Sequence, residues 1–456
     1  MKIKSVFLAA ILTAVLCING NVFAVLSGGG TQTNPYLIQS RADFDEFANP
    51  ANSAIYWTTY VYTKLMCDPN LSGTTYTQAV IAPDTDSSDY WGFQGTVFDG
   101  IFEGNGHIIS NLTIASTQDH IGLFGYFGQY AQIRNLGVEN VNITGRNYVG
   151  GLAGCSGFGK LTACYATGSV SGTDYYAGGL VGKGWSGALT DCYATCSVSG
   201  TNGVGGLVGN SWGSLTACYA TGSVSGTSCV GGLAGEDRSL LITGCYATGS
   251  VTGNEDVGGL VGFHCYGSLT ASYATGSVSG NSNVGGLVGF QNASSITNCY
   301  SAGAVSGIGQ SSSLGGLLGK NWGSLTGCFW DIQTSGLNYS AGGTGKMTAD
   351  MKKLLTFTSP PDSWDFTNET TNGTNDYWRM CTEDVDYPRL NWQSTDGDLA
   401  CPNGVNMEDL NYYVGWWLMN NCTPTNNYCG GADINKTGMV NLVDFSIFAE
   451  NWLEGI

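Results

Sequence analysis

One phrase recurs along this chain and decides its fold. Residues 204–227 read VGGLVGNSWGSLTACYATGSVSGT, and residues 257–281 read VGGLVGFHCYGSLTASYATGSVSGN. Self-similarity of this kind is typical of solenoids, in which a unit buries its apolar face only by stacking on its neighbours. The double glycines that open the copies start 28, 27, 26, 27, 27 and 30 residues apart, at Gly150, Gly178, Gly205, Gly231, Gly258, Gly285 and Gly315.

Each copy is predicted to form short strands separated by sharp corners. Its phrases GGL(V/A/L)G and CYATGSVSG are rich in Val, Thr and Tyr and are bounded by Gly, Asn or Ser, which are strand and turn signals. Glycine disfavours a helix by about 1 kcal/mol relative to Ala. With a degenerate copy at 121–125, the repeats span 121–330. The sequence predicts a mainly β protein, a parallel β-solenoid (β-helix) of about eight coils with a period near 27 residues, capped at both ends.

Stacked copies place like residues on top of one another. Alternation along the strand puts Cys218 and Ala220 on one face and Tyr219 on the other, and the small residues favour the cysteine face as the interior. Stacked Cβ atoms about 4.8 Å apart do not suit a disulfide, so free buried thiols are predicted. One slot holds Cys164, Cys192, Cys218, Cys245, Ser272, Cys299 and Cys328, and the next holds Tyr165, Tyr193, Tyr219, Tyr246, Tyr273, Tyr300 and Phe329.

The core Gly206-Leu207-Val208-Gly209 and its copies resemble the GLUG motif, a glycine-rich repeat of bacterial exported and surface proteins. The resemblance covers about 121–330. It implies a β-solenoid stalk or platform and assigns the motif no catalytic role.

A further column of aromatic residues follows the glycine phrase. Exposed aromatics in a row can stack on sugar rings, and they can equally pack over a corner of the solenoid; both interpretations stay open. The column holds Phe158, Trp185, Trp212, Tyr266 and Trp322, interrupted by Arg238 and Ala293. The candidate carbohydrate-binding residues are Trp185, Trp212, Tyr266 and Trp322.

The first residues indicate export. Residues 1–24 carry Lys2 and Lys4 ahead of an apolar run, as a secretory signal peptide does. Without them the net charge is 14 − 34 = −20, which argues against binding to nucleic acid. No later stretch is apolar for the roughly 20 residues that a membrane span requires. We therefore expect a secreted, extracellular or cell-surface protein.

The flanks of the repeats are expected to cover the open ends of the solenoid. Residues 25–120 are predicted to form an N-terminal cap and the first coils, and residues 331–395 a C-terminal cap, because exposed strand edges need covering. Within the first flank, the acidic run 84–89 (DTDSSD) is predicted to be a solvated turn, with a cation site as the alternative.

Residues 396–456 predict a small α-helical, EF-hand-like domain. The segment 433–444 (DINKTGMVNLVD) has oxygen-bearing side chains at loop positions 1, 3, 5, 9 and 12 and glycine at 6, the spacing of a calcium loop. Apolar residues then follow at helical spacing. The predicted calcium ligands are Asp433, Asn435, Thr437, Met439 through its carbonyl, Asn441 and Asp444.

An earlier half-copy of this loop is weaker. Asp398, Asn406 and Asp409 occupy positions 1, 9 and 12, but Ala400 and Pro402 stand where ligands are expected at positions 3 and 5. The half-copy is either a weak calcium site or a vestige. One pair among Cys401, Cys422 and Cys429 can form a disulfide in an exported protein.

Two loop–helix units in tandem resemble a type I dockerin domain. The resemblance implies calcium as the cofactor and docking onto a cohesin-like protein, in assemblies often devoted to polysaccharide degradation. Positions 10 and 11, which select the partner in many dockerins, are Leu442-Val443 and Met407-Glu408 here. This departure leaves open whether the partner is cohesin-like or another cell-envelope protein.

Two functions compete. The first is a non-catalytic scaffold or adhesin, with polysaccharide as a further ligand. The alternative is a polysaccharide-degrading enzyme, a glycoside hydrolase or lyase, and glycoside hydrolysis requires two carboxylates about 5–10 Å apart. The nearest candidates are Glu236 with Asp237 on one coil and Glu255 with Asp256 on the next, on opposite sides of the glycine phrase. The non-catalytic function is favoured, and no catalytic residue is assigned.

Overall fold

The computed structural model describes residues 26–86, 92–361, 363–367, 375–393, 407–423, 429 and 432–452, without the side chains of 309–312 and 408. The predicted signal peptide at 1–24, the predicted ligands Asp398 and Asn406, and Cys401 lie outside these described residues.

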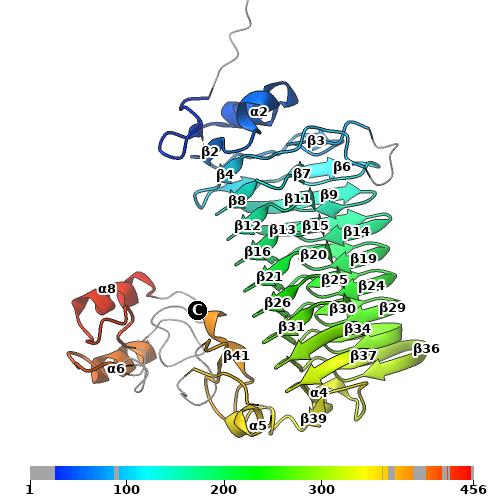
Figure 1. Cartoon of the computed structure of the whole chain (residues 1–456), viewed down its shortest axis with the longest axis vertical. Helices are drawn as coiled ribbons and strands as arrows, with labels where there is room; N and C mark the ends of the chain where they lie inside the picture. The colour runs from blue at the N-terminus through cyan, green and yellow to red at the C-terminus, as the bar shows by residue number, and fades with distance from the viewer. Residues whose placement is uncertain are drawn as a thin grey trace, which may run out of the picture.

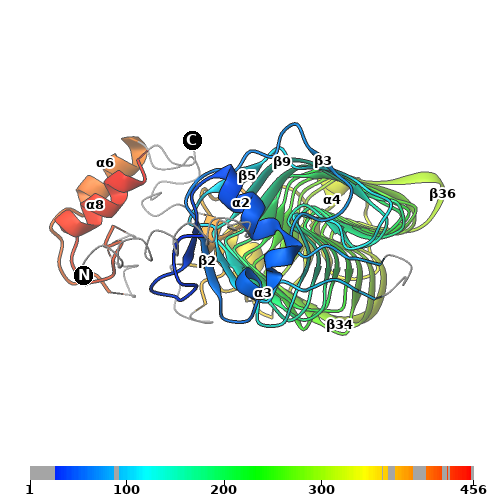
Figure 2. The same ribbon diagram turned by 90° about the horizontal axis from the view of Figure 1, so that it is seen from above.

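The chain forms a parallel β-solenoid of about 11 turns with a period near 27 residues, seen from the side in Figure 1 and turned by 90° in Figure 2. One column of strands, each paired in parallel with the next, counts the turns. It consists of β1 (Tyr36–Ile38), β2 (Tyr62–Leu65), β4 (Ile101–Glu103), β8 (Gln132–Arg134), β12 (Lys160–Thr162), β16 (Ala188–Thr190), β21 (Ser214–Thr216), β26 (Leu241–Thr243), β31 (Ser268–Thr270), β34 (Val288–Thr297) and β37 (Leu318–Thr326).

The predicted number of about eight coils is wrong. The eight strands from β8 onward belong to the recognisable repeats, but β1, β2 and β4 stack beneath them in the same column. These three turns do not share the repeated phrase, so self-similarity could not reveal them.

A second column in the same sheet carries the glycine phrase. The surface formed by the outward side chains of this column is called the outer face below. The strands of the column are β7 (Phe124–Phe127), β11 (Ala153–Ser156), β15 (Val181–Gly184), β20 (Val208–Ser211), β25 (Ala234–Asp237) and β30 (Val261–Cys265), before it continues into β34 and β37.

The other large sheet carries the tyrosine phrase and the segment before each double glycine. Its tyrosine column is β5 (Ile108–Ser110), β9 (Gly137–Gly145), β13 (Tyr165–Gly172), β17 (Tyr193–Ala194), β22 (Tyr219–Ala220), β27 (Tyr246–Ala247), β32 (Tyr273–Ala274), β35 (Tyr300–Ser301), β38 (Phe329–Asp331) and β39 (Thr344–Lys346). The remaining strands are β3 (Thr75–Tyr76), β6 (Thr113–Ala115), β10 (Val149–Gly150), β14 (Tyr175–Gly178), β18 (Ser197–Ser199), β19 (Asn202–Gly205), β23 (Val224–Ser225), β24 (Ser228–Gly231), β28 (Val251–Thr252), β29 (Glu255–Gly258), β33 (Val278–Gly285) and β36 (Val305–Gly315).

The predicted ladders are confirmed. Tyr165 pairs in register with Tyr193, and the ring centroids of successive tyrosines up to Tyr300 lie between 4.7 and 5.1 Å apart. The cysteine slot faces the interior, where Cys164 and Cys218 are fully buried free thiols. Burial raises the pKa of both thiols, which keeps them neutral.

The first turn is covered by helices. In α2 (Arg41–Ala48) the apolar side chains Phe44 and Phe47 are buried, while the Ser40 hydroxyl caps the helix by accepting from the Asp43 amide. The helix is followed by η1 (Pro50–Asn52) and α3 (Ser53–Tyr56). Figure 1 shows α2 across the N-terminal end of the stack.

The C-terminal end of the solenoid differs from its N-terminal end. β39 pairs with β38 after the short helix α4 (Ile332–Ser335), so it extends the edge. The next segment packs on the outward tyrosines instead: Tyr300 donates from its hydroxyl to the Pro388 carbonyl at 2.8 Å, and Trp392 donates to the Gly244 carbonyl at 2.9 Å. Its elements are α5 (Leu354–Thr358), β40 (Trp378–Arg379), antiparallel β41 (Arg389–Leu390) and η2 (Asn391–Gln393).

Two helices close the described chain, α6 (Met407–Gly415) and α8 (Leu442–Glu450). Tyr413 and Phe448 stack at a centroid distance of 5.2 Å, and both are buried. The disulfide Cys422–Cys429 contributes to the same small core, which confirms one of the pairings open to the three cysteines of this region. Among the described residues no helix is long and apolar enough to cross a membrane.

Candidate functional site

The segment 433–444 forms a tight turn around two buried carboxylates. Asp433 accepts hydrogen bonds from the amides of Thr437 (3.0 Å) and Gly438 (2.7 Å). Asp444 accepts from the amides of Asn435 (3.1 Å) and Asn441 (2.9 Å). The two carboxylates are 1% and 0% exposed. Gly438 has φ +95°, a left-handed conformation that suits glycine at the sixth position of the turn.

These residues fit a hard cation. No salt bridge to Asp433 or Asp444 comes from the described residues, so two buried negative charges face one turn without a cationic partner. A buried charge is costly unless it is paired or coordinates a metal. The donor set of carboxylate, amide, hydroxyl and carbonyl oxygens is the one that calcium prefers. Among the described residues no three His, Cys, Asp or Glu side chains are placed so that they could hold a metal ion by themselves, so the amide and hydroxyl oxygens would be needed.

Two predicted ligands are engaged with each other and with the following helix. The side-chain amide of Asn441 donates to the Met439 carbonyl at 3.1 Å, and its side-chain oxygen accepts from the Val443 amide at 2.8 Å. Asn441 and Asp444 thereby form a capping box at the start of α8. In the weaker half-copy only Asp409 is described, and it is fully buried in the first turn of α6.

The predicted aromatic column is partly wrong. Trp185, Trp212 and Arg238 share one column, because Gly184, Ser211 and Asp237 before them are in register. Continuing the register aligns Cys265 and Asn292 with Trp322, so Tyr266 lies one residue outside the column. The reason is an extra residue: Gly262 and Gly267 are five positions apart, whereas Gly209 and Gly213 are four apart. Tyr266 absorbs the insertion in a left-handed conformation, φ +68°.

The four candidate aromatics are exposed but differ in their neighbours. Tyr266 and Trp322 are 71% and 63% exposed. Trp185 and Trp212 are 39% and 40% exposed, with ring centroids 6.0 Å apart at 40°. Cations lie over the tryptophans, with the Lys183 Nζ 3.7 Å from the Trp185 centroid and the Lys320 Nζ 4.3 Å from that of Trp322. Trp185 and Trp212 are therefore partly covered and partly exposed, and the stacking of sugar rings on them stays a prediction.

The carboxylates considered for catalysis point in different directions. Asp237 is fully buried inside the solenoid, where it binds His264 Nδ1 at 2.7 Å. Glu236 faces outward and is held by the Arg238 Nε at 2.6 Å and the Tyr176 hydroxyl at 3.1 Å. On the next turn Asp256 accepts from the Asn283 amide at 2.7 Å. Glu255 is exposed.

A cavity of about 360 Å³ lies near the N-terminal end of the same outer face. Its lining combines aromatic rings with one lysine, one histidine and one thiol. The lining residues are Phe93, Val97, His120, Tyr126, Tyr148, Cys155, Lys183 and Trp185.

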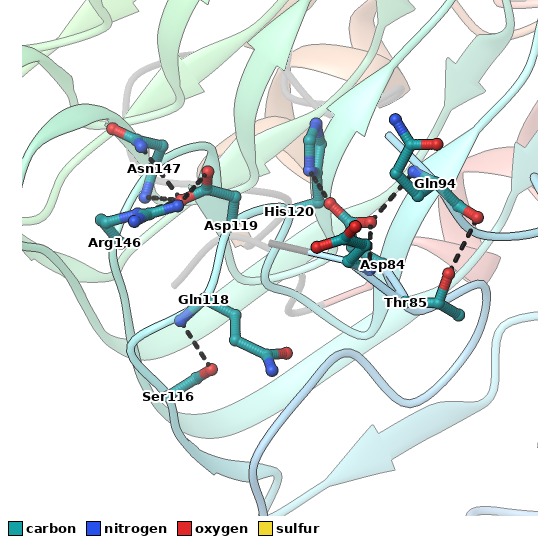
Figure 3. Close-up of polar contacts among 10 residues, drawn as sticks. Asp84, Thr85, Gln94, Ser116, Gln118, Asp119, His120, Arg146 and Asn147 are labelled. Atoms are coloured by element: carbon teal, nitrogen blue, oxygen red, sulfur yellow. Dashed lines mark hydrogen bonds and ion pairs between the residues drawn. The ribbon is translucent and has the colours of Figure 1, made fainter. Parts of the chain in front are cut away.

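Asp84, the first residue of the acidic run, supports the walls of this cavity. Asp84 is 4% exposed, and its Oδ2 lies 2.9 Å from His120 Nδ1 while its Oδ1 accepts from the Gln94 amide at 3.0 Å (Figure 3). The bond to Gln94 fixes the backbone next to Phe93. Asp84 therefore positions two walls of the cavity, and the prediction of a solvated turn is wrong for this residue. The remaining members 87–89 of the run lie outside the described residues.

A second buried carboxylate supports the adjacent wall. Asp119 binds Arg146 through two bonds of 2.8 Å and accepts from the Asn147 amide at 3.1 Å (Figure 3). These contacts fix the backbone that presents Tyr148. Neither carboxylate lies in the repeated phrase, and the sequence carried no signal that would pair Asp84 with His120 across 36 residues.

Comparison with known proteins identifies the repeat. A family described as "The GLUG motif" matches residues 145–171 and 280–306. Halomucin of Haloquadratum walsbyi is 36% identical over 156 residues, which are 33% of this chain and 2% of halomucin. A protein of Evansella cellulosilytica, provisionally named a Gly-rich membrane protein, is 31% identical over 127 residues, 28% of this chain and 13% of that protein. The chain thus spans a small part of the length of these curated relatives.

One solved structure also resembles the chain. It is the crystal structure of a Bacteroides ovatus protein described as a candidate immunoglobulin A1 protease, with 20% identity, a TM-score of 0.44, and coverage of 80% of this chain and 94% of that chain. Together with the register of the strands, the motif matches establish that this chain carries GLUG repeats on a parallel β-solenoid.

Proposed function

We propose that this chain is an exported, non-catalytic scaffold or adhesin of the cell surface. The observation that carries the proposal is the in-register stack of about 11 turns, which buries a continuous apolar interior and leaves one long outer face. A rigid stack of this kind suits a platform that holds ligands at a distance from its attachment point. The signal-peptide pattern at 1–24 supports export, and the relative described as a membrane protein supports a place at the cell envelope.

Polysaccharide is the ligand that the outer face favours. Trp322 and Tyr266 are more than half exposed, and Trp185 and Trp322 each lie beside a lysine of their own turn. Aromatic rings provide an apolar face for a sugar, and cations and hydroxyl groups provide polar contacts.

The polysaccharide-degrading enzyme remains the alternative, and the contacts of the carboxylates do not favour it. Asp237 is enclosed with His264, and Glu236 is paired with Arg238, so neither is free to act on a ligand. A general acid and a nucleophile or base must both reach the glycosidic bond.

A polysaccharide panel separates these functions. The full chain is incubated with each polymer while retention and release of reducing ends are both recorded. We expect retention without release, and retention that falls in Trp322→Ala but not in Glu236→Gln. Release of reducing ends that disappears in Glu236→Gln or Asp256→Asn would replace the proposal by the enzyme.

The C-terminal segment is proposed to be a calcium-stabilised, dockerin-like module that attaches the solenoid to a protein partner. Support comes from the buried carboxylates Asp433 and Asp444 and from the equivalent burial of Asp409 on the paired helix. Asp433, Asn435, Thr437, Met439, Asn441 and Asp444 would hold the ion. Calcium would contribute a counter-charge that keeps the turn and the start of α8 in place.

The chemistry of the partner follows from the exposed side chains of the module. Leu442 and Val443, at loop positions 10 and 11, are 73% and 56% exposed. Their apolar surface favours a protein partner, either cohesin-like or another protein of the cell envelope.

Calcium titration tests the module. We expect heat of binding in the full chain, its loss in Asp433→Ala, and its retention in Asp350→Ala, an exposed aspartate of the preceding segment that pairs with Lys353. Calcium should raise the free energy of unfolding by about 2.7 kcal/mol at a concentration 100 times the Kd, and the thermal unfolding temperature should rise accordingly. Equal calcium affinity of the chain and Asp433→Ala would remove the proposed ion site.

A further inference from the structure

The cavity near the N-terminal end of the outer face contains a lysine that forms no ion pair with any of the described residues. Lys183 is 8% exposed, and no hydrogen bond or ion pair to its ammonium group comes from the described residues. Cys155 beside it is fully buried, and burial raises the pKa of its thiol to about 12, so the thiol supplies no negative charge. Glu236, the acidic residue nearest in the column, is already engaged by Arg238 and Tyr176.

Aromatic rings surround the ammonium group. The Lys183 Nζ lies 3.7 Å from the Trp185 ring centroid, 5.2 Å from that of Tyr148 and 5.6 Å from that of Tyr176. Ring faces attract a cation, but they do not neutralise its charge. Desolvation lowers the pKa of Lys183 although the charge of Glu236 acts in the opposite direction, so an anion bound in the cavity would further stabilise the charged form.

The other walls carry hydrogen-bonding groups fixed in place. His120 is 3% exposed, and its Nδ1 is bound by Asp84, so Nε2 is the nitrogen left to meet a ligand. Burial raises the pKa of Tyr126 to about 12, so its hydroxyl stays protonated and can donate. The ring of Phe93 lies 5.0 Å from that of Tyr126 and 5.3 Å from His120.

We propose that this cavity binds the carboxylated sugar ring of an acidic polysaccharide, with the ligand carboxylate on Lys183 and the ring against the exposed side of Trp185. The inference deepens the carbohydrate-binding part of the proposed function and rests on it. It assigns a ligand class and adds the polar contacts of Lys183 and His120 to the exposed aromatics of the outer face.

A sugar acid fits the lining better than a small inorganic anion or an acidic peptide. A volume of about 360 Å³ walled by aromatic rings is far larger than one phosphate or sulfate needs. A peptide carboxylate would carry a backbone with several donors and acceptors, whereas the described lining offers few fixed polar groups. A ring with one carboxylate matches one ammonium group, a few hydroxyl-binding groups and flat apolar walls.

Titration calorimetry with matched ligands tests the proposal on the full chain. The probes are oligomers of galacturonate, of mannuronate and of glucuronate, together with sialyllactose, and each acid is compared with its methyl ester. We expect at least one acid to bind and its ester to bind at least roughly tenfold more weakly, because a charged hydrogen bond is lost. Lys183→Met should weaken the acid by a similar factor and leave the ester unchanged, and Lys183→Arg should restore most of the affinity.

Lys352→Met is the matched control, since Lys352 also lies over an aromatic ring, that of Tyr387, but in the C-terminal segment outside the cavity. It should bind the acid as the parent chain does. A thermal unfolding curve shows that each variant is folded. If no acid binds, or if Lys183→Met binds the acid as tightly as the parent, the inference is wrong. Retention of neutral polysaccharide by Lys183→Met, together with its loss in Trp322→Ala, would then leave the broader carbohydrate-binding function standing.

Discussion

The repeated turns between residues 148 and 319 and the three turns at the N-terminal end share one stack but are built from unlike sequences. Thr190, Thr216 and Thr243 stack at intervals of 216 − 190 = 26 and 243 − 216 = 27 residues. At the N-terminal end, Glu103 stacks on Lys64 after 39 residues (103 − 64). The interior changes as well, from Val, Leu, Ala and Cys in the repeats to large aromatic rings such as Phe44, Phe47, Tyr56, Phe98 and Phe102 at the N-terminal end.

The difference explains where the cavity forms. A regular turn has little spare chain, because nearly every residue is either in a strand or at a corner. The 39-residue turn contains Asp84 and Phe93, which build one side of the cavity against the first regular turns. The proposed sugar-acid site therefore lies where the repeat is interrupted, and the first regular turns supply its other wall.

The largest expected effect comes from the close packing of the regular turns. In Gly232→Val the added Cβ would lie 2.1 Å from the Gly259 carbonyl oxygen on the next turn and 2.9 Å from the Ala247 Cβ. We expect a loss of about 4 kcal/mol or more in unfolding free energy, measured by urea denaturation. Gly106→Asn in an N-terminal turn is the control, since its surroundings are open and Asn tolerates its left-handed φ of +78°. Equal losses of unfolding free energy in both variants would contradict the close packing described for the regular turns.

The aromatic interior of the N-terminal turns gives the next effect. Phe102 is fully buried against Phe47 and Phe124, at centroid distances of 5.3 and 5.9 Å. Phe102→Ala should cost about 3–5 kcal/mol, whereas Val230→Ala in a regular turn should cost about 1.6 kcal/mol for its two methyl groups. Because a solenoid turn contacts only its neighbours, faster hydrogen exchange should stay near the mutated turn. Exchange that accelerates along the entire stack would argue for a single cooperative unit.

The regular turns themselves contain one buried polar pair. Asp237 Oδ2 and His264 Nδ1 are 2.7 Å apart, and both side chains are fully buried. Asp237→Ala should cost about 3 kcal/mol, because it leaves His264 without its partner. Replacing both residues, by Asp237→Val and His264→Leu, should recover most of that loss. Urea midpoints of the two single variants and the double variant check this, and additive losses would show that the pair is not coupled.

The smallest expected effect is the acid sensitivity of the cavity. Burial raises the pKa of Asp84, but the His120 hydrogen bond and the amides of Gln94 and Asp86 outweigh it, so the pKa lies below its usual value. A lowered folded-state pKa adds stability above the unfolded value of about 3.9, and this stability is lost as the pH falls through the folded value. The parent chain should therefore lose more stability than Asp84→Asn between pH 6 and pH 3. If the two proteins lose the same stability between pH 6 and pH 3, Asp84 contributes no pH-dependent stabilisation.

The regular turns were predicted correctly because identical residues recur in each copy and stack on one another. The outward tyrosines, the inward cysteines and the free thiols all follow from a period of 27 residues and strand alternation. First coils were predicted within residues 25–120, but the total number of turns was too low, because Phe and Trp fill the same cross-section there without repeating any phrase. Tyr266 was misplaced because one inserted residue shifts the register locally. Asp84, His120 and Lys183 come together only through stacking of turns, which no local pattern encodes.

The stack of about 11 turns is tested most directly by one distance in solution. Lys64 and Thr326 belong to the same column, separated by nine strand-to-strand steps through Glu103, Arg134, Thr162, Thr190, Thr216, Thr243, Thr270 and Thr297. At about 4.8 Å per step the separation is about 43 Å. Double electron–electron resonance between non-cysteine spin labels at these two positions should give one narrow distance distribution centred near that value. A broad distribution, or one displaced by more than the length of the labels, would contradict a continuous stack that begins before the recognisable repeats.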